Sequence, residues 1–304
     1  MAKQLLYRSQ NYAGNCIQGE RNYQEDDFSF DNSQPDDFLM VLADGMGGHQ
    51  GGEIASRCTV ETFKNHYHAV SGQVAKRLYK ALLQANHQLV LKAQSQPKLK
   101  GMGCTLVGVT IHDNKLEWIS VGDSPLWLYS TGRLRRLNAD HSMKPFLQEQ
   151  VKLGELTPQE AAIHPDRNML LSALVGTQID LIDQSSVPIK LHPGDHVLLA
   201  SDGILTLSNA EIGKILAKPF SAKNLVNKLL KAVETKAKLN QDNTTVLVVK
   251  VPDELMKKQA SSMPWQTRLL ALLVILSLIL WASVHFQVID LVQLITQMFE
   301  VAGF

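Results

Sequence analysis

Five aspartates share one setting along the chain, because each lies where an apolar run begins or ends: Asp26, Asp44, Asp123, Asp202 and Asp242. Several stand beside a glycine, which lets a backbone carbonyl approach a bound cation closely. Carboxylates, carbonyls and waters are the ligands that Mg²⁺ and Mn²⁺ prefer, and the sequence has no His/Cys cluster typical of zinc. The set and its order therefore predict a divalent-cation site, although a single Asp-Gly pair is also a common turn.

The elements that must position these aspartates are mostly strands. Runs with strand character cover residues 37–43, 105–111, 115–121, 125–129, 196–200 and 244–251. Apolar residues at three- and four-residue spacing predict helices over residues 52–67, 71–94 and 221–238, the last with Ser221 as its N-cap. Because the strands come in adjacent pairs more often than they alternate with helices, antiparallel sheets covered by helices are favoured over a doubly wound parallel fold.

A series of motifs runs through residues 10–250. In chain order they are RNYQED (21–26), ADGMGGHQGGEIAS (43–56), GMGCTL (101–106), VGDSPLWLY (121–129), ADHS (139–142), GELTPQEAAIHPDRNMLLSALVG (154–176), ASDGILTLSNAEI (200–212) and QDNTTVLVV (241–249). Together they resemble the metal-dependent protein phosphatase family, also called type 2C, in its bacterial form. The resemblance implies an α+β fold, a β-sandwich of two antiparallel sheets flanked by helices in four α-β-β-α layers.

The resemblance also implies metal ligands. Asp44 would bridge two Mn²⁺ or Mg²⁺ ions, with the carbonyl of Gly45 as a further ligand. Asp202 and Asp242 would hold the second ion. Two such cations would lower the pKa of a shared water and neutralise charge on the phosphoryl group during in-line attack. No protein nucleophile is then required, and no phospho-enzyme intermediate is expected.

Further roles follow for residues around these ligands. Asp26 would contact metal-bound waters, and Asp123 would help to bind a weaker third ion. Glu25 would either ligate a metal or bind only its waters, and the sequence leaves both open. Arg21 would bind the substrate phosphate, since its planar guanidinium fits phosphate oxygens. Most relatives have arginine where this chain has Pro125, which puts the role of that arginine in doubt here.

The function expected from the resemblance is hydrolysis of phosphoserine and phosphothreonine on proteins, in opposition to a serine/threonine kinase. Arg21 and Asp44 are the expected catalytic residues. Two alternatives are a catalytically weak phosphoprotein-binding scaffold on the same fold and a metal-dependent hydrolase of small phosphate esters. The formal net charge of +1, with 19% charged residues, argues against a nucleic-acid partner.

The C-terminal part of the chain is different in composition. Residues 269–284 contain no charged side chain, and the low-charge run continues to residue 289, which is long enough to cross a bilayer as a helix. Basic residues precede the run and acidic residues follow it, so the catalytic domain is expected on the cytoplasmic side of a single membrane span. The expected organisation is a phosphatase domain (1–252), a linker (253–267), a transmembrane helix (268–289) and a short tail (290–304).

Overall fold

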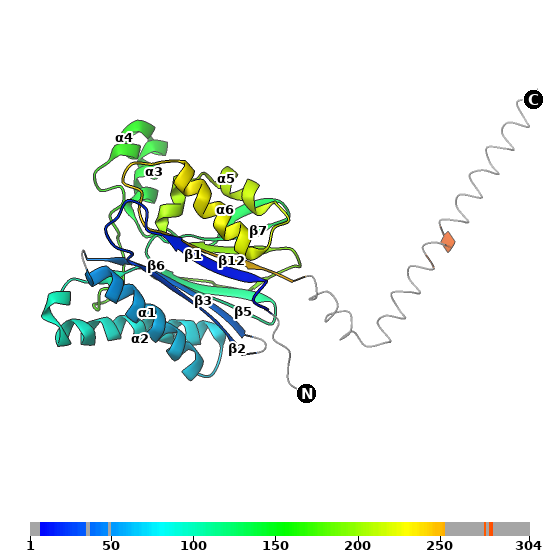
Figure 1. The fold of residues 1–304 in the computed structure, drawn as a ribbon, viewed down its shortest axis with the longest axis horizontal. Coiled ribbons are helices and arrows are strands. Elements are labelled where there is room, and N and C mark those ends of the chain that lie inside the picture. Colours follow the sequence, from blue (N-terminus) through cyan, green and yellow to red (C-terminus); the bar gives the residue numbers. More distant parts are fainter. Residues whose placement is uncertain (1–6, 35–36, 48–49, 253–276, 278–279, 282–304) are drawn as a thin grey trace, which may run out of the picture. The chain divides into compact units, whose positions relative to one another are not determined.

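The structure is a computed structural model that describes residues 7–34, 37–47, 50–252, 277 and 280–281 (Figure 1). The chain divides into two compact units, Met1–Asp253 and Glu254–Phe304. The predicted linker and tail lie outside the described residues, as does the predicted transmembrane helix apart from residues 277, 280 and 281. Within the described part of the chain, no helix is long and apolar enough to cross a membrane, so the structure gives the predicted span no support.

Two antiparallel sheets form the centre of the first unit. In the five-stranded sheet the strand order is β1 (Tyr12–Ile17), β12 (Thr244–Lys250), β11 (His196–Ala200), β7 (Leu126–Ser130) and β8 (Arg133–Arg136). In the seven-stranded sheet it is β10 (Ile189–Lys190), β6 (Lys115–Val121), β5 (Leu106–His112), β3 (Asp37–Met46) and β2 (Asp26–Gln34). Two short strands complete this second sheet, β4 (Gly103–Cys104) beside β3 and β9 (Asp183–Gln184) beside β6.

Helices cover the sheets from outside (Figure 1). The long helices α1 (Gln50–Ala69) and α2 (Val74–Ser95) pack on the seven-stranded sheet, and α5 (Asn209–Leu216) and α6 (Ala222–Thr235) pack on the five-stranded sheet. The helices α3 (Met143–Leu153) and α4 (Pro158–Ile163) follow β8 and contact each other. This arrangement confirms the predicted α+β fold of two antiparallel sheets flanked by helices.

Each sheet buries an apolar core against its helices. Val41 of β3 lies with Phe63 of α1 in one core, and Val248 of β12 lies with Leu229 of α6 in the other. The neighbouring Leu42 points to the opposite face of its sheet and is also fully buried. Because central strands are covered on both faces, they appear in the sequence as continuous apolar runs.

The predicted elements correspond closely to the observed ones. The six strand-like runs are β3, β5, β6, β7, β11 and β12, and the three predicted helices are α1, α2 and α6. The hydroxyl of Ser221 accepts a hydrogen bond from the backbone N–H of Asn224 at 3.3 Å, which confirms the predicted N-cap of α6. Strand β1 was not predicted, because its sequence YAGNCI has little apolar periodicity and its residues are only partly buried.

Candidate active site

A cleft of about 640 Å³ brings four of the predicted aspartates together, with Arg21 and Gly45 in its lining. Asp44 lies near the end of β3, and Asp123 lies in the turn between β6 and β7. Asp202 begins the short 3-10 helix η2 (Asp202–Thr206) after β11, and Asp242 precedes β12. Asp44 belongs to the seven-stranded sheet, and Asp202 and Asp242 adjoin strands of the five-stranded sheet. Asp123 lies in the connection from one sheet to the other, so the cleft forms only when the sheets pack together.

Asp26 lies opposite Asp44 in the β2–β3 pair but is not among the residues that line the cleft. Its side chain is buried, and one carboxylate oxygen, Oδ2, accepts hydrogen bonds from the hydroxyls of Ser201 and Thr245, each at 2.7 Å. The other oxygen, Oδ1, is buried and has no hydrogen-bond partner among the described residues. It is the atom available for the contact with metal-bound water that the sequence predicts.

Burial and mutual repulsion disfavour the ionised forms of three aspartates in the site and so raise their pKa values. Burial, followed by the charges of Asp26 and Asp202, raises the pKa of Asp44 well above its usual range. Burial, followed by the charge of Asp123, raises the pKa of Asp202 to about 7, although Lys144 opposes this. Burial also raises the pKa of Asp26 to about 6. A bound cation would offset the cost of burying these negative charges and would reduce the repulsion between them. The electrostatics of the cleft therefore favour cation binding.

Two side-chain cations partly balance these carboxylates. The guanidinium of Arg21 lies 2.6 Å from a carboxylate oxygen of Asp242, and the Arg21 side chain is 54% exposed. The ammonium of Lys144 is buried and lies 2.8 Å from Asp123 and 3.8 Å from Asp202. Arg21 is therefore free to exchange one anionic partner for another, whereas Lys144 is enclosed.

The residues present fit a centre for hard divalent cations. All the charged ligands offer oxygen, and the backbone around Gly45 is packed so closely that a Cβ there would lie 2.3 Å from the carbonyl oxygen of Gly52. Across the described residues, no three carboxylate, imidazole or thiol side chains already converge enough to hold one ion. Asp242 is directed to Arg21 and Asp123 to Lys144, so metal binding requires at least some of these carboxylates to reorient.

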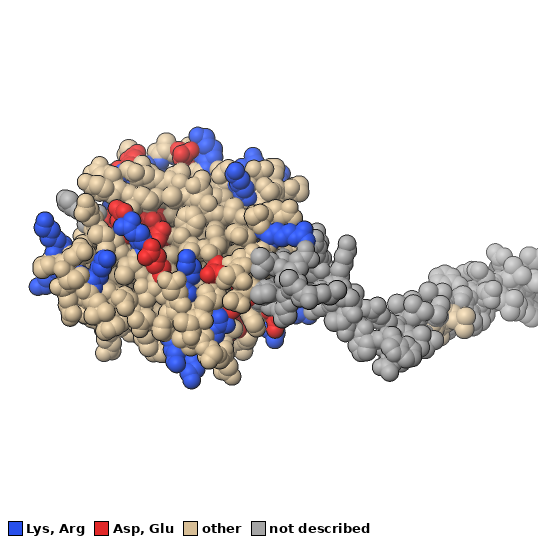
Figure 2. Space-filling view, turned by 60° about the horizontal axis from the view of Figure 1, so that its bottom comes forward, with Lys and Arg blue, Asp and Glu red and all other residues tan. Residues whose placement is uncertain are grey.

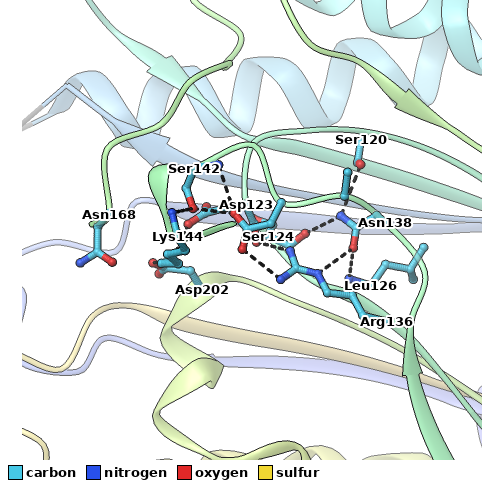
Figure 3. A network of polar contacts seen from close by, with 12 residues as sticks. Ser120, Asp123, Ser124, Leu126, Arg136, Asn138, Ser142, Lys144, Asn168 and Asp202 are labelled. Atoms are coloured by element: carbon cyan, nitrogen blue, oxygen red, sulfur yellow. Dashed lines mark hydrogen bonds and ion pairs between the residues drawn. The ribbon is translucent and has the colours of Figure 1, made fainter. Parts of the chain in front are cut away.

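Arg136 at the end of β8 and Asn138 just after it bind the turn that carries Asp123 (Figure 3). Arg136 donates a hydrogen bond to the carbonyl oxygen of Asp123 at 2.9 Å and forms an ion pair with Asp140 at 3.1 Å. Asn138 donates to the carbonyl of Ser124 at 2.9 Å. The family resemblance leads us to expect an arginine where Pro125 stands, and an arginine from elsewhere in the chain, Arg136, binds the backbone of this turn.

Sequence reasoning missed several residues of the site. Lys144 follows the ADHS motif by two positions, and only a lysine in the otherwise apolar first turn of α3 (MKPF) could have marked it. Ser201 and Thr245, which hold Asp26, lie inside recognised motifs but carry no separate signal. Glu25 does line the cleft, as expected. Its role as a direct ligand stays a prediction.

Comparison with known proteins decides the family. Residues 15–247 match the family described as Protein phosphatase 2C. The chain belongs to the protein phosphatase 2C family. It is 32% identical over 241 residues to the serine/threonine phosphatase stp of Listeria innocua, which covers 75% of this chain and 90% of that protein. It is 31% identical over 220 residues to the serine/threonine protein phosphatase PstP of Mycobacterium tuberculosis, over 71% of this chain and 40% of that protein.

Solved structures agree with this assignment. A crystal structure of the M. tuberculosis phosphatase PstP/Ppp superposes with a TM-score of 0.67 at 29% identity, over 79% of this chain and 98% of the other. A structure of the PstP catalytic domain in complex with two manganese ions superposes with a TM-score of 0.66 at 28% identity, over 80% and 98%. The chain is thus a 2C-type serine/threonine protein phosphatase, and phosphatases of this family use two Mn²⁺ or Mg²⁺ ions.

Proposed function

We propose that this phosphatase removes phosphate from phosphoserine and phosphothreonine of proteins by direct attack of water, in opposition to a serine/threonine kinase. The observation that best supports this proposal is the cleft whose lining includes an exposed Arg21 and four aspartates: Asp44, Asp123, Asp202 and Asp242. Asp44, Asp202, Asp242 and the Gly45 carbonyl would hold the two ions. When bound, these ions supply an activated water and neutralise charge on the phosphoryl oxygens.

The chain's own residues would bind and orient the phosphate. Arg21 would exchange its contact with Asp242 for the phosphate of the substrate, to which its fork can donate two parallel hydrogen bonds. This exchange releases the carboxylate of Asp242 from Arg21, so that it can bind a metal ion while Arg21 binds the substrate phosphate. Asp26 would accept a hydrogen bond from water at its buried Oδ1.

The lining of the cleft supports water as the nucleophile. Among the described residues that line it, there is no histidine, cysteine or lysine. The Thr105 hydroxyl accepts the backbone N–H of Asp44 at 3.0 Å and contacts the Ser124 hydroxyl. The Ser172 hydroxyl donates to the carbonyl of Leu181 and accepts its N–H. Thr177 also lines the cleft, and its hydroxyl donates to the carbonyl of Gln178 at 3.5 Å. Because all three hydroxyls have partners and the lining offers no histidine or lysine to activate them, none is suited to attack phosphorus.

Phosphate release from a phosphothreonine peptide, with and without Mn²⁺, tests this function. We expect release only with Mn²⁺ and a severe loss in Asp202→Asn. The same rate with and without Mn²⁺ would rule out the two-metal mechanism. Full metal binding without peptide hydrolysis would favour the phosphoprotein-binding scaffold. Hydrolysis of small phosphate esters but not of the peptide would favour a metal-dependent hydrolase of small phosphate esters.

The proposed site of action is the inner face of a membrane, with the low-charge run of residues 268–289 as a single span. This proposal rests on the sequence of that run. Deletion after residue 255 retains the whole of the first compact unit and should yield soluble, active enzyme. Recovery of the full-length protein in the soluble fraction without detergent would refute the tether. A phosphoproteome comparison with and without active enzyme would identify the opposed kinase through its substrates.

The charge on one face of the molecule does not favour a nucleic-acid partner. On the face of the described residues shown in Figure 2, lysines and arginines are scattered among acidic and neutral side chains and form no continuous basic stripe. Binding to a nucleic-acid backbone usually requires such a stripe. The substrate phosphate would instead be recognised locally, by Arg21 and the metal centre.

A further inference from the structure

One buried lysine approaches the carboxylates of the centre, and the phosphatase function does not explain it. Lys144 lies in the first turn of α3, and its ammonium points at Asp123 and Asp202 (Figure 3). The Lys144 residue is only 7% exposed. Because a fully desolvated lysine is rarely tolerated without an anionic partner, these carboxylates are the reason the side chain can stay there.

The backbone that carries Lys144 is fixed on both sides. The hydroxyl of Ser142 caps α3 and itself donates to Asp140 at 2.5 Å. The backbone N–H of Met143 donates to the carbonyl of Met169 at 3.0 Å, and Leu147, one turn further along, is buried. The ammonium is therefore delivered to the two carboxylates by a helix that is tied to its surroundings, and not by a mobile surface side chain.

The position of this ammonium matters because Asp123 is the aspartate expected to bind a weaker third ion. A divalent cation that bridged Asp123 toward Asp202 would occupy the space where the ammonium now lies, 2.8 Å and 3.8 Å from the two carboxylates. Two cations cannot share that space, since they repel each other and would compete for the same oxygen atoms. The residues present thus fit two divalent ions but not the third.

We propose that the Lys144 ammonium is a permanent substitute for the third cation, so that this phosphatase binds two divalent ions and no more. The lysine neutralises Asp123 without dependence on metal concentration. It also links α3 to the strand ends that carry the catalytic carboxylates, which a diffusible ion could do only while bound. This inference rests on the proposed metal centre and concerns the number of ions that it holds.

The number of bound Mn²⁺ ions tests the inference directly. The full-length protein in detergent would be titrated with Mn²⁺ up to millimolar concentrations, with free Mn²⁺ measured by its EPR signal. We expect two bound ions in the wild type and three in Lys144→Ala, which vacates the space beside Asp123. Lys152→Ala is the matched control, because Lys152 lies on the same helix but is 73% exposed and pairs with Glu149. It should bind two ions.

Other outcomes would overturn the inference. Three ions in the wild type, or two in a folded Lys144→Ala protein, would contradict it. Folding of each variant would be checked by circular dichroism. If Lys144→Ala does not fold, Asp123→Asn in the otherwise wild-type chain still decides: a count that stays at two supports the inference, and a fall from three to two refutes it. A wild-type protein that binds no Mn²⁺ would instead refute the proposed metal centre itself.

Discussion

Replacement of Arg21 by alanine would remove the side chain that we place at the substrate phosphate, while leaving the carboxylates of the centre intact. Hydrogen bonds to charged groups contribute about 1.5–3 kcal/mol. The substrate must first break the contact between Arg21 and Asp242, and such an exposed ion pair is worth about 0–1 kcal/mol. The net contribution of Arg21 to substrate binding is then about 0.5–3 kcal/mol, which corresponds to a roughly 2- to 150-fold loss of kcat/KM.

The assay would be Mn²⁺-saturated hydrolysis of a phosphothreonine peptide, with KM and kcat determined separately. We expect most of the loss in KM if Arg21 binds ground state and transition state alike. Arg21→Lys should fall between wild type and Arg21→Ala, since lysine keeps the charge but lacks the planar fork. Apparent Mn²⁺ affinity should stay the same or increase in Arg21→Ala, because Asp242 loses its competing cation.

Arg57→Ala provides a matched control for loss of a surface ion pair. The side chains of Arg57 and Glu53 are 55% and 46% exposed, against 54% and 39% for Arg21 and Asp242. The control should remain within about twofold of wild type, since exposed pairs contribute little. Activity of Arg21→Ala within the same range would refute the placement of Arg21 at the phosphate. So would a loss that arises entirely from weaker Mn²⁺ binding.

Three further predictions concern packing and protonation. Asp37→Ala should destabilise the fold by about 3–5 kcal/mol in urea unfolding, because Asp37 is buried and its removal leaves the guanidinium of Arg77, now 2.8 Å away, without this partner. Burial lowers the pKa of His196 to about 4, so its contribution to stability is fully present above pH 6.5 and is lost as the pH falls toward 4. That loss is about 3 kcal/mol. The free energy of unfolding of His196→Phe should therefore depend less on pH between 4 and 6.5 than that of the wild type. An equal pH dependence of the two proteins would contradict the lowered pKa of His196. Gly45→Ala should cost about 1–3 kcal/mol from overpacking against Gly52 and should also weaken Mn²⁺ binding measured by titration calorimetry.

Much of this protein is determined locally and can therefore be predicted from sequence. Strands such as β3 and β12 are long apolar runs, because the sandwich buries both their faces, and α6 begins at a serine that can cap it. The aspartates stand out because each follows or precedes such a run. Their order along the chain was sufficient to predict a divalent-cation centre, and the family comparison confirms metal use.

Tertiary structure alone decided how the charges of the site are balanced. The contacts of Arg21 with Asp242 and of Asp26 with Thr245 join residues 221 and 219 positions apart, so no local pattern could reveal them. Lys144 is an ordinary lysine in the sequence, and only the packing of α3 turns it into a buried counter-ion of Asp123. Residue types and strand ends place the ligands, but the choice between a bound metal and a side-chain cation depends on distances that only the packed sheets and helices set.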